Sequence, residues 1–92
     1  MESAPWVEEK VTVRTMQGLH ARPAREVWAA ARKFTSEVHI VKGPVDADAK
    51  SIFDIMTLDA PCGTELTVRA RGTDAADAVR AVGQVISTEF KE

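Results

Sequence analysis

The six residues from Gly18 to Pro23, Gly-Leu-His-Ala-Arg-Pro, place a histidine and an arginine in one short segment. A neutral imidazole nitrogen is a nucleophile that can accept a phosphoryl group, and a guanidinium binds phosphate oxygens through a planar set of N–H donors. Proline fixes φ and lacks an N–H donor, which costs little in the first turn of a helix. The segment therefore predicts a phosphate-accepting site in which His20 is the acceptor, Arg22 binds the phosphate and Pro23 orients the turn.

Hydrophobic periodicity predicts that this turn joins a strand to a helix. Val11 and Val13 alternate with polar residues in a strand over residues 9–15, and apolar residues recur at helical spacing over residues 21–34. A helix that begins here directs unpaired backbone N–H groups, and the positive end of its dipole, toward a phosphate on His20.

The rest of the chain is predicted to form three further strands and two further helices. Apolar residues alternate in strands over 38–41, 45–49 and 66–70, of which the first two form a hairpin. Ser51 is the expected N-cap of a short helix that ends near Leu58, with Asp54 in a capping box. A last helix, capped by residue 73 or 74, runs to Phe90, and Gly83 either weakens it or permits close packing.

The order βαββαβα predicts an α+β fold, in which three helices cover one face of a four-stranded antiparallel sheet. The other face is expected to meet water and to lack aromatic residues. The 92 residues predict a single domain over 1–92, with residues 1–7 as a loose N-terminal leader.

Composition excludes several classes of function. The net charge of -2 gives no bulk attraction to nucleic acid or to an anionic membrane. One cysteine and two histidines leave no internal disulfide and no structural zinc site, so we expect no metal. The chain lacks a Walker-type loop, a signal peptide and an apolar run of membrane-spanning length, which favours a cytoplasmic protein without its own nucleotide chemistry.

The Gly18–Pro23 segment, together with Ala49-Lys50-Ser51-Ile52, resembles HPr, the histidine-containing phosphocarrier of the bacterial phosphotransferase system. The similarity extends over nearly the whole domain and includes the start of the last helix at Gly72-Thr73-Asp74-Ala75. It implies an open-faced β-sandwich in which His20 is phosphorylated, Arg22 is its phosphate partner and Ser51 is a regulatory serine.

The same resemblance implies a phosphocarrier that forms a covalent phosphohistidine, is not itself an enzyme and holds no cofactor. Its partners would be an enzyme I-type phosphoryl donor, enzyme IIA-type acceptor domains and, for Ser51, an HPr kinase/phosphorylase. We expect a monomer with no nucleic-acid partner and no membrane insertion. The sequence departs from the usual family pattern at Phe53, Asp54 and Asp59-Ala60, on the surface that family members use to recognise partners.

Apolar residues next to the two motifs predict a docking surface. A helix of about two turns leaves part of its apolar side exposed, and exposed apolar patches mark protein contacts. Phe53 and Met56 are expected to contact partners, whereas Ile52 is expected to share the core. The candidate partner-binding residues are Met16, Leu19, Ile52, Phe53 and Met56.

Two other classes of function remain open at this stage. The chain could be a regulatory adaptor controlled mainly by phosphorylation of Ser51, with transfer at His20 secondary or lost. A nucleic-acid module on the open sheet face is disfavoured by the mixed charges expected there. His39 and Cys62 lack neighbours in sequence that would mark a catalytic role, and Trp28 has core spacing, whereas Trp6 either covers an edge or stays mobile.

Overall fold

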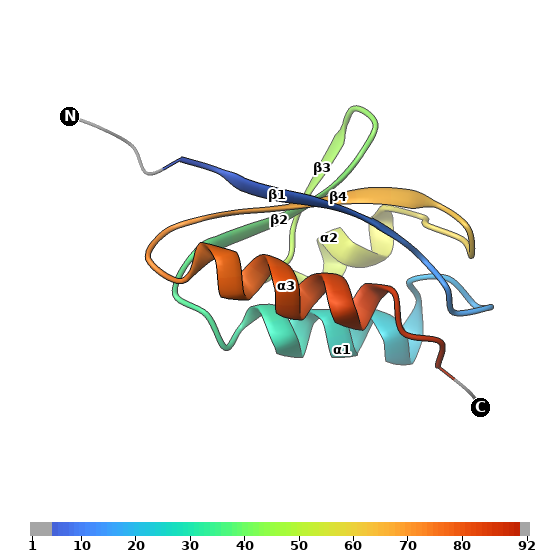
Figure 1. Ribbon diagram of the computed structural model, residues 1–92. Coiled ribbons are helices and arrows are strands. Elements are labelled where there is room, and N and C mark those ends of the chain that lie inside the picture. Colours follow the sequence, from blue (N-terminus) through green and yellow to red (C-terminus); the bar gives the residue numbers. More distant parts are fainter. Residues whose placement is uncertain (1–4, 91–92) are drawn as a thin grey trace.

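The computed structural model describes residues 5–90, which form four strands and three helices in the predicted order (Figure 1). The strands are β1 (Val7–Thr12), β2 (Glu37–Lys42), β3 (Val45–Asp48) and β4 (Glu65–Arg71). The helices are α1 (Ala21–Ala31), α2 (Ile52–Thr57) and α3 (Ala75–Ile86). The sheet order is β1-β4-β2-β3 with every neighbouring pair antiparallel, which confirms the predicted α+β fold and the β2–β3 hairpin.

The hydrophobic core fills the layer between the sheet and the helices, which lie on one side of it in Figure 1. Alternate residues of β2 and β4 point into this layer, because successive side chains of a strand face opposite sides. Helices α1 and α3 turn their apolar stripes toward the same layer. The residues that these four elements contribute to the hydrophobic core cluster are Val38, Ile40, Leu66, Val68, Ala70, Ala24, Val27, Ala31, Ala75, Ala78, Val79, Val82 and Ile86.

The boundaries of three elements differ from the predicted ones by more than one residue. Strand β1 covers residues 7–12 instead of 9–15, although Val13 remains buried beyond its end. Helix α1 ends at Ala31, three residues before Phe34, and α3 ends at Ile86, so Phe90 is not helical. Hydroxyl groups explain the end of α3, since Ser87 and Thr88 donate hydrogen bonds to the carbonyls of Gly83 (2.9 Å) and Gln84 (2.7 Å). The Thr88 hydroxyl takes the Gln84 carbonyl, which a longer helix would have paired with the N–H of Thr88, and that N–H donates to Val85 instead (3.1 Å).

The N-cap of α2 is confirmed, but its capping box is only half formed. The Ser51 hydroxyl oxygen accepts a hydrogen bond from the backbone N–H of Asp54 at 3.3 Å. The Asp54 carboxylate accepts from the N–H of Asp48 (3.2 Å), while the N–H of Ser51 donates to the Asp48 carbonyl (3.0 Å). The predicted return bond is therefore replaced by a bond that ties α2 to the end of β3.

The N-cap of α3 is Asp74, but its carboxylate caps no N–H group of that helix. Both carboxylate oxygens instead accept hydrogen bonds from Thr35 and Ser36, in the turn before β2. The Ser36 hydrogen bond is the main reason that the pKa of Asp74 falls to about 2. Asp74 thus joins the start of α3 to the connection between α1 and β2.

The open face of the sheet carries an aromatic residue, which corrects two predictions. The Trp6 ring lies under the guanidinium carbons of Arg69 and Arg71, at 4.1 and 4.4 Å from its centroid, and meets the His39 ring edge-on at 5.6 Å. Cations are attracted to the face of an indole ring, so the two arginines hold Trp6 on the sheet. The predicted leader therefore ends earlier than residue 7, which already belongs to β1, and residues 1–4 lie outside the described residues.

Candidate functional site

The turn that carries His20 is held by three backbone hydrogen bonds. The N–H of Gly18 donates to Thr15 (3.0 Å), that of His20 to Gly18 (3.0 Å), and that of Leu19 to Ala60 in the connection before β4 (2.9 Å). Gly18 has φ +76, a left-handed conformation that glycine adopts without steric cost. The position of the histidine thus depends on contacts between segments about forty residues apart in sequence.

His20 is the N-cap of α1, with extended backbone angles (φ -126, ψ 160), and its side chain is exposed. Among residues 5–90, its imidazole makes no hydrogen bond and caps no N–H of the helix. The next residue, Ala21, has φ +51, which is unfavourable for a residue with a Cβ. Strained backbone of this kind collects at functional sites, and here it leaves a ring with free nitrogens at the positive end of a helix.

Arg22 and Pro23 form the first turn of α1 with Ala21, as the site prediction requires. Pro23 is buried, whereas Arg22 is exposed on the same turn. The guanidinium carbon of Arg22 lies 5.5 Å from the centroid of the Phe90 ring. Sequence reasoning missed Phe90 as a neighbour of the site, because its helical spacing from α3 placed it in the core.

Three of the five predicted partner-binding residues are exposed, and two are not fully available. Met16, in the turn before His20, is 81% exposed, and Phe53 and Met56 on α2 are 79% and 42% exposed. Ile52 is half-buried, as expected for a residue shared with the core. Leu19 is 1% exposed, so its predicted contact with a partner is corrected to a core contact beneath the turn.

Asp59 lies in the turn that follows α2. It has φ +52, a left-handed conformation that aspartate tolerates better than most residues with a Cβ. The Lys42 ammonium group donates hydrogen bonds to the carbonyls of Leu58 (3.0 Å) and Asp59 (2.7 Å). This lysine satisfies carbonyls at the end of α2 and thereby holds the turn.

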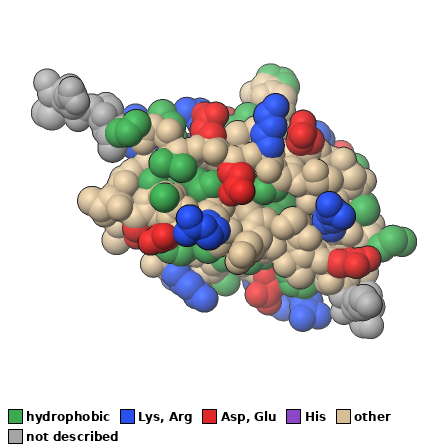
Figure 2. Space-filling model, viewed as in Figure 1, with side chains coloured by type: hydrophobic (Ala, Val, Ile, Leu, Met, Phe, Trp, Pro, Cys, Tyr) green, Lys and Arg blue, Asp and Glu red, His purple; other side chains and the backbone are tan. Residues whose placement is uncertain are grey.

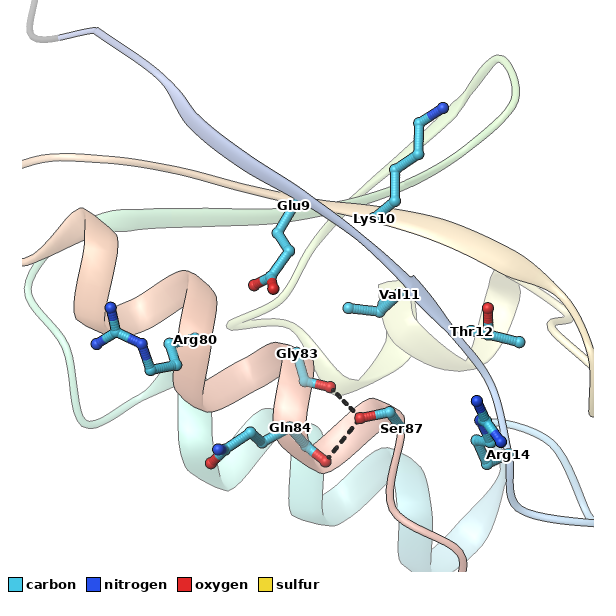
Figure 3. A pocket seen from close by; sticks show the side chains of 9 residues that line it. All are labelled: Glu9, Lys10, Val11, Thr12, Arg14, Arg80, Gly83, Gln84 and Ser87. Atoms are coloured by element: carbon cyan, nitrogen blue, oxygen red, sulfur yellow. Dashed lines mark hydrogen bonds between the residues drawn. The ribbon is translucent and has the colours of Figure 1, made fainter.

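A groove between β1 and α3 lies apart from the candidate site and includes none of its predicted residues (Figure 3). Gly83 forms part of this groove, and a Cβ there would lie 3.1 Å from the Val11 side chain, which confirms the close-packing alternative for this glycine. The groove is lined by Glu9, Lys10, Val11, Thr12, Arg14, Arg80, Gly83, Gln84 and Ser87.

Charges of both signs alternate over the face shown in Figure 2, with no extended basic patch on that face. Among residues 5–90, no group of three His, Cys, Asp or Glu side chains is arranged to hold a metal ion. Cys62 is exposed, and its thiol is 3.6 Å from the Arg14 carbonyl. No helix within the described part of the chain is long and apolar enough to span a membrane.

His39 lies on the open face of the sheet between two carboxylates. Its Nδ1 is 2.7 Å from Asp46 on β3, and its Nε2 is 2.9 Å from Glu37, which also pairs with Arg71 at 3.1 Å. Carboxylate oxygens only accept hydrogen bonds, so both ring nitrogens must carry protons for both contacts to form. Burial lowers the pKa of His39, but the hydrogen bonds to Glu37 and Asp46 outweigh it and raise the pKa above 6.5.

The stabilising effect of His39 is expected to fall as the pH rises. Because the folded pKa is above the unfolded one, the contribution is complete below about pH 6.5 and is lost through the folded pKa. Urea unfolding of the wild type and of His39→Gln should show a larger difference in stability at about pH 6 than at about pH 9. A difference that stays constant across this range would contradict the assignment of His39 as a doubly bonded imidazolium.

Comparisons with known proteins identify relatives of this chain. Residues 7–88 match the family model described as the PTS HPr component phosphorylation site. The chain is 35% identical to the phosphocarrier protein HPr of Treponema pallidum over 86 residues, which cover 94% of this chain and 98% of the relative.

Two solved structures show the same fold. The crystal structure of HPr from Bacillus anthracis has a TM-score of 0.84 and 33% identity, over 88% of this chain and 96% of that one. The crystal structure of Crh, the catabolite repression containing protein of Bacillus subtilis, has a TM-score of 0.73 and 37% identity, over 94% and 99% of the two chains. That Crh structure is an intertwined dimer with a swapped domain.

Proposed function

This chain belongs to the HPr family of phosphocarrier proteins, and from that premise we propose that it accepts a phosphoryl group on His20 from an enzyme I-type donor and passes it to enzyme IIA-type acceptors. The observation that carries the proposal is the exposed His20 ring at the start of α1, which has no hydrogen-bond partner among residues 5–90. Transfer from phosphoenolpyruvate through enzyme I, with His20→Ala as the comparison, tests it.

The proposed step needs only one nucleophile from this chain. A lone pair on a neutral His20 nitrogen forms a bond to phosphorus while the bond between phosphorus and the donor breaks, and the donor leaves with that electron pair. The reverse process delivers the group to the acceptor. The chain is a carrier between two enzymes, and the exposed position of the ring allows both of them to reach it.

Two features of α1 stabilise the phosphorylated form. Unpaired N–H groups and the helix dipole contribute about 0.3–1 kcal/mol to an anion at an exposed N-terminus. A charge-assisted hydrogen bond from Arg22 contributes about 1.5–3 kcal/mol, so the arginine is the larger effect. Its planar fork also matches two phosphate oxygens at once, which the single ammonium group of lysine cannot do.

We further propose Ser51 as a regulatory phosphorylation site that weakens docking at α2. Its hydroxyl caps α2 by accepting the backbone N–H of Asp54, and its own N–H donates to the backbone carbonyl of Asp48. Both of these neighbouring residues carry a carboxylate. A phosphate on Ser51 would add negative charge next to both carboxylates and beside the exposed Phe53. Repulsion and desolvation of this charge oppose contact with an apolar or acidic partner surface.

We expect Ser51→Asp to slow phosphoryl transfer from enzyme I to His20, because it places a charge at the edge of the apolar contact surface. The measurement is the initial rate of His20 phosphorylation at limiting chain concentration. Thr73→Asp is the matched control, because Thr73 is exposed at the start of α3 and receives the same charge. Equal rates for the two variants would contradict a docking role for Ser51. Incubation of the wild type with ATP and an HPr kinase/phosphorylase, followed by mass spectrometry, tests whether Ser51 is a substrate.

Similarity to Crh, a catabolite repression containing protein, supports one alternative: a regulatory adaptor in which Ser51 phosphorylation controls binding and transfer at His20 is secondary or lost. The two functions differ in whether enzyme I phosphorylates His20. The predicted monomer also stays a prediction, since the Crh structure is a swapped dimer. The cytoplasm is the proposed compartment, because the proposed donor and acceptor domains act there.

A further inference from the structure

The chain that follows α3 packs against the candidate site. Phe90 lies four residues beyond the end of α3 and is half-buried. Its carbonyl oxygen is 3.5 Å from the hydroxyl of Thr15, a fully buried residue whose own carbonyl accepts the N–H of Gly18. Its ring faces the Arg22 guanidinium at 5.5 Å. One residue therefore contacts both the turn that precedes His20 and the arginine that follows it.

Within residues 5–90, the guanidinium of Arg22 contacts the Phe90 ring. Among residues 5–90, the guanidinium forms no hydrogen bond and no ion pair, and the Phe90 ring is its described partner. A benzene ring attracts a cation through its quadrupole and accepts no conventional hydrogen bond. The N–H donors of Arg22 consequently remain available, whereas a carboxylate in the same place would occupy them.

We propose that Phe90 is a positioning residue that holds the Arg22 guanidinium at the His20 turn while leaving its N–H donors free for phosphate oxygens. The inference rests on the proposed function and deepens it. A free arginine side chain samples many rotamers, and ordering them is a cost that binding a phosphate must otherwise overcome. Contact with the ring orders the side chain before the phosphoryl group arrives, at the small energy expected of an exposed cation–π pair.

The kinetic test compares Phe90→Leu, which keeps apolar bulk but removes the ring, with Phe90→Tyr, which keeps the ring. We expect Phe90→Leu to slow phosphorylation of His20 by about two- to fivefold, the factor that corresponds to an exposed cation–π contact. Phe90→Tyr should restore the wild-type rate. Phe34→Leu is the matched control, since Phe34 is also half-buried and packs on the core.

A double-mutant cycle separates positioning from structural support. In an Arg22→Ala background, Phe90→Leu should have no further effect, because the ring then has no guanidinium to hold. Equal slowing by Phe90→Leu with and without Arg22, or equal slowing by Phe34→Leu, would overturn the proposal. Urea unfolding of each variant identifies any loss of rate that comes from a loss of fold.

A second readout does not depend on phosphoryl transfer. In the unphosphorylated protein, the Nε–H signal of Arg22 in an NMR spectrum should shift when Phe90→Leu removes the ring current. It should remain near its wild-type position in Phe90→Tyr. An Arg22 signal that is insensitive to both substitutions overturns the contact itself. Failure of the wild type to accept a phosphoryl group, with the Arg22 signal still sensitive to the ring, would instead refute the proposed function.

Discussion

In His20→Ala, we expect no phosphoryl transfer from phosphoenolpyruvate through enzyme I, whereas the wild type acquires one acid-labile, base-stable phosphate. The alanine side chain has no lone pair with which to form the bond to phosphorus, so the loss should be complete. The fold should remain intact, because the His20 ring is exposed and makes no hydrogen bond among residues 5–90. Intact-mass spectrometry at high pH measures the phosphate, and urea unfolding checks the fold.

His39→Gln is the matched control, since His39 is the other of the two histidines in the chain. It lies on the open sheet face between Glu37 and Asp46, so its loss should leave transfer to His20 intact. If His20→Ala acquired phosphate at the wild-type level, His20 could not be the phosphate acceptor and the proposal would be refuted. Loss of phosphate from His39→Gln but not from His20→Ala would show that His39, on the open face of the sheet, is the phosphate acceptor instead of His20.

Gly18→Ala should be among the most destabilising single substitutions in the chain, at about 2–5 kcal/mol. A left-handed backbone costs a residue with a Cβ about 1–2 kcal/mol. The Cβ at position 18 would also lie 2.6 Å from the Ala60 carbonyl oxygen and 3.0 Å from the Cα of Pro61. Both neighbours are backbone atoms, so relief requires separating the His20 turn from the connection that precedes β4.

Gly43→Ala isolates the conformational part of this cost. Gly43 also has a positive φ, +56, but a Cβ there would meet nothing within 4 Å. Urea unfolding should therefore show a loss of about 1–2 kcal/mol for Gly43→Ala and a clearly larger one for Gly18→Ala. Phosphorylation of His20 should also slow in Gly18→Ala, because the Leu19–Ala60 hydrogen bond adjoins the clash. If the two variants lost the same free energy of unfolding, the backbone at Ala60 would have to move away from the new Cβ without a measurable loss of stability.

Most of the fold could be predicted from patterns of residues that are close in sequence. Strand alternation at Leu66, Val68 and Ala70 and helical spacing in α1 and α3 depend on residues close in sequence, and the structure confirms them. Ser51 was likewise identified as an N-cap from its own neighbours. Boundaries were less predictable, because the end of α3 depends on competition between hydroxyl groups and backbone N–H groups for the same carbonyls.

The sequence by itself determined the order of elements and the chemical identity of the candidate site, because a histidine, an arginine and a proline within four residues need no distant partner to be recognised. Only the tertiary structure decided what surrounds them. It buried Leu19 beneath the turn, placed Phe90 against Arg22, and set His39 between Glu37 and Asp46. The physical reason is that these contacts join different strands, turns and helix ends, and periodicity within one element contains no information about which other element packs against it.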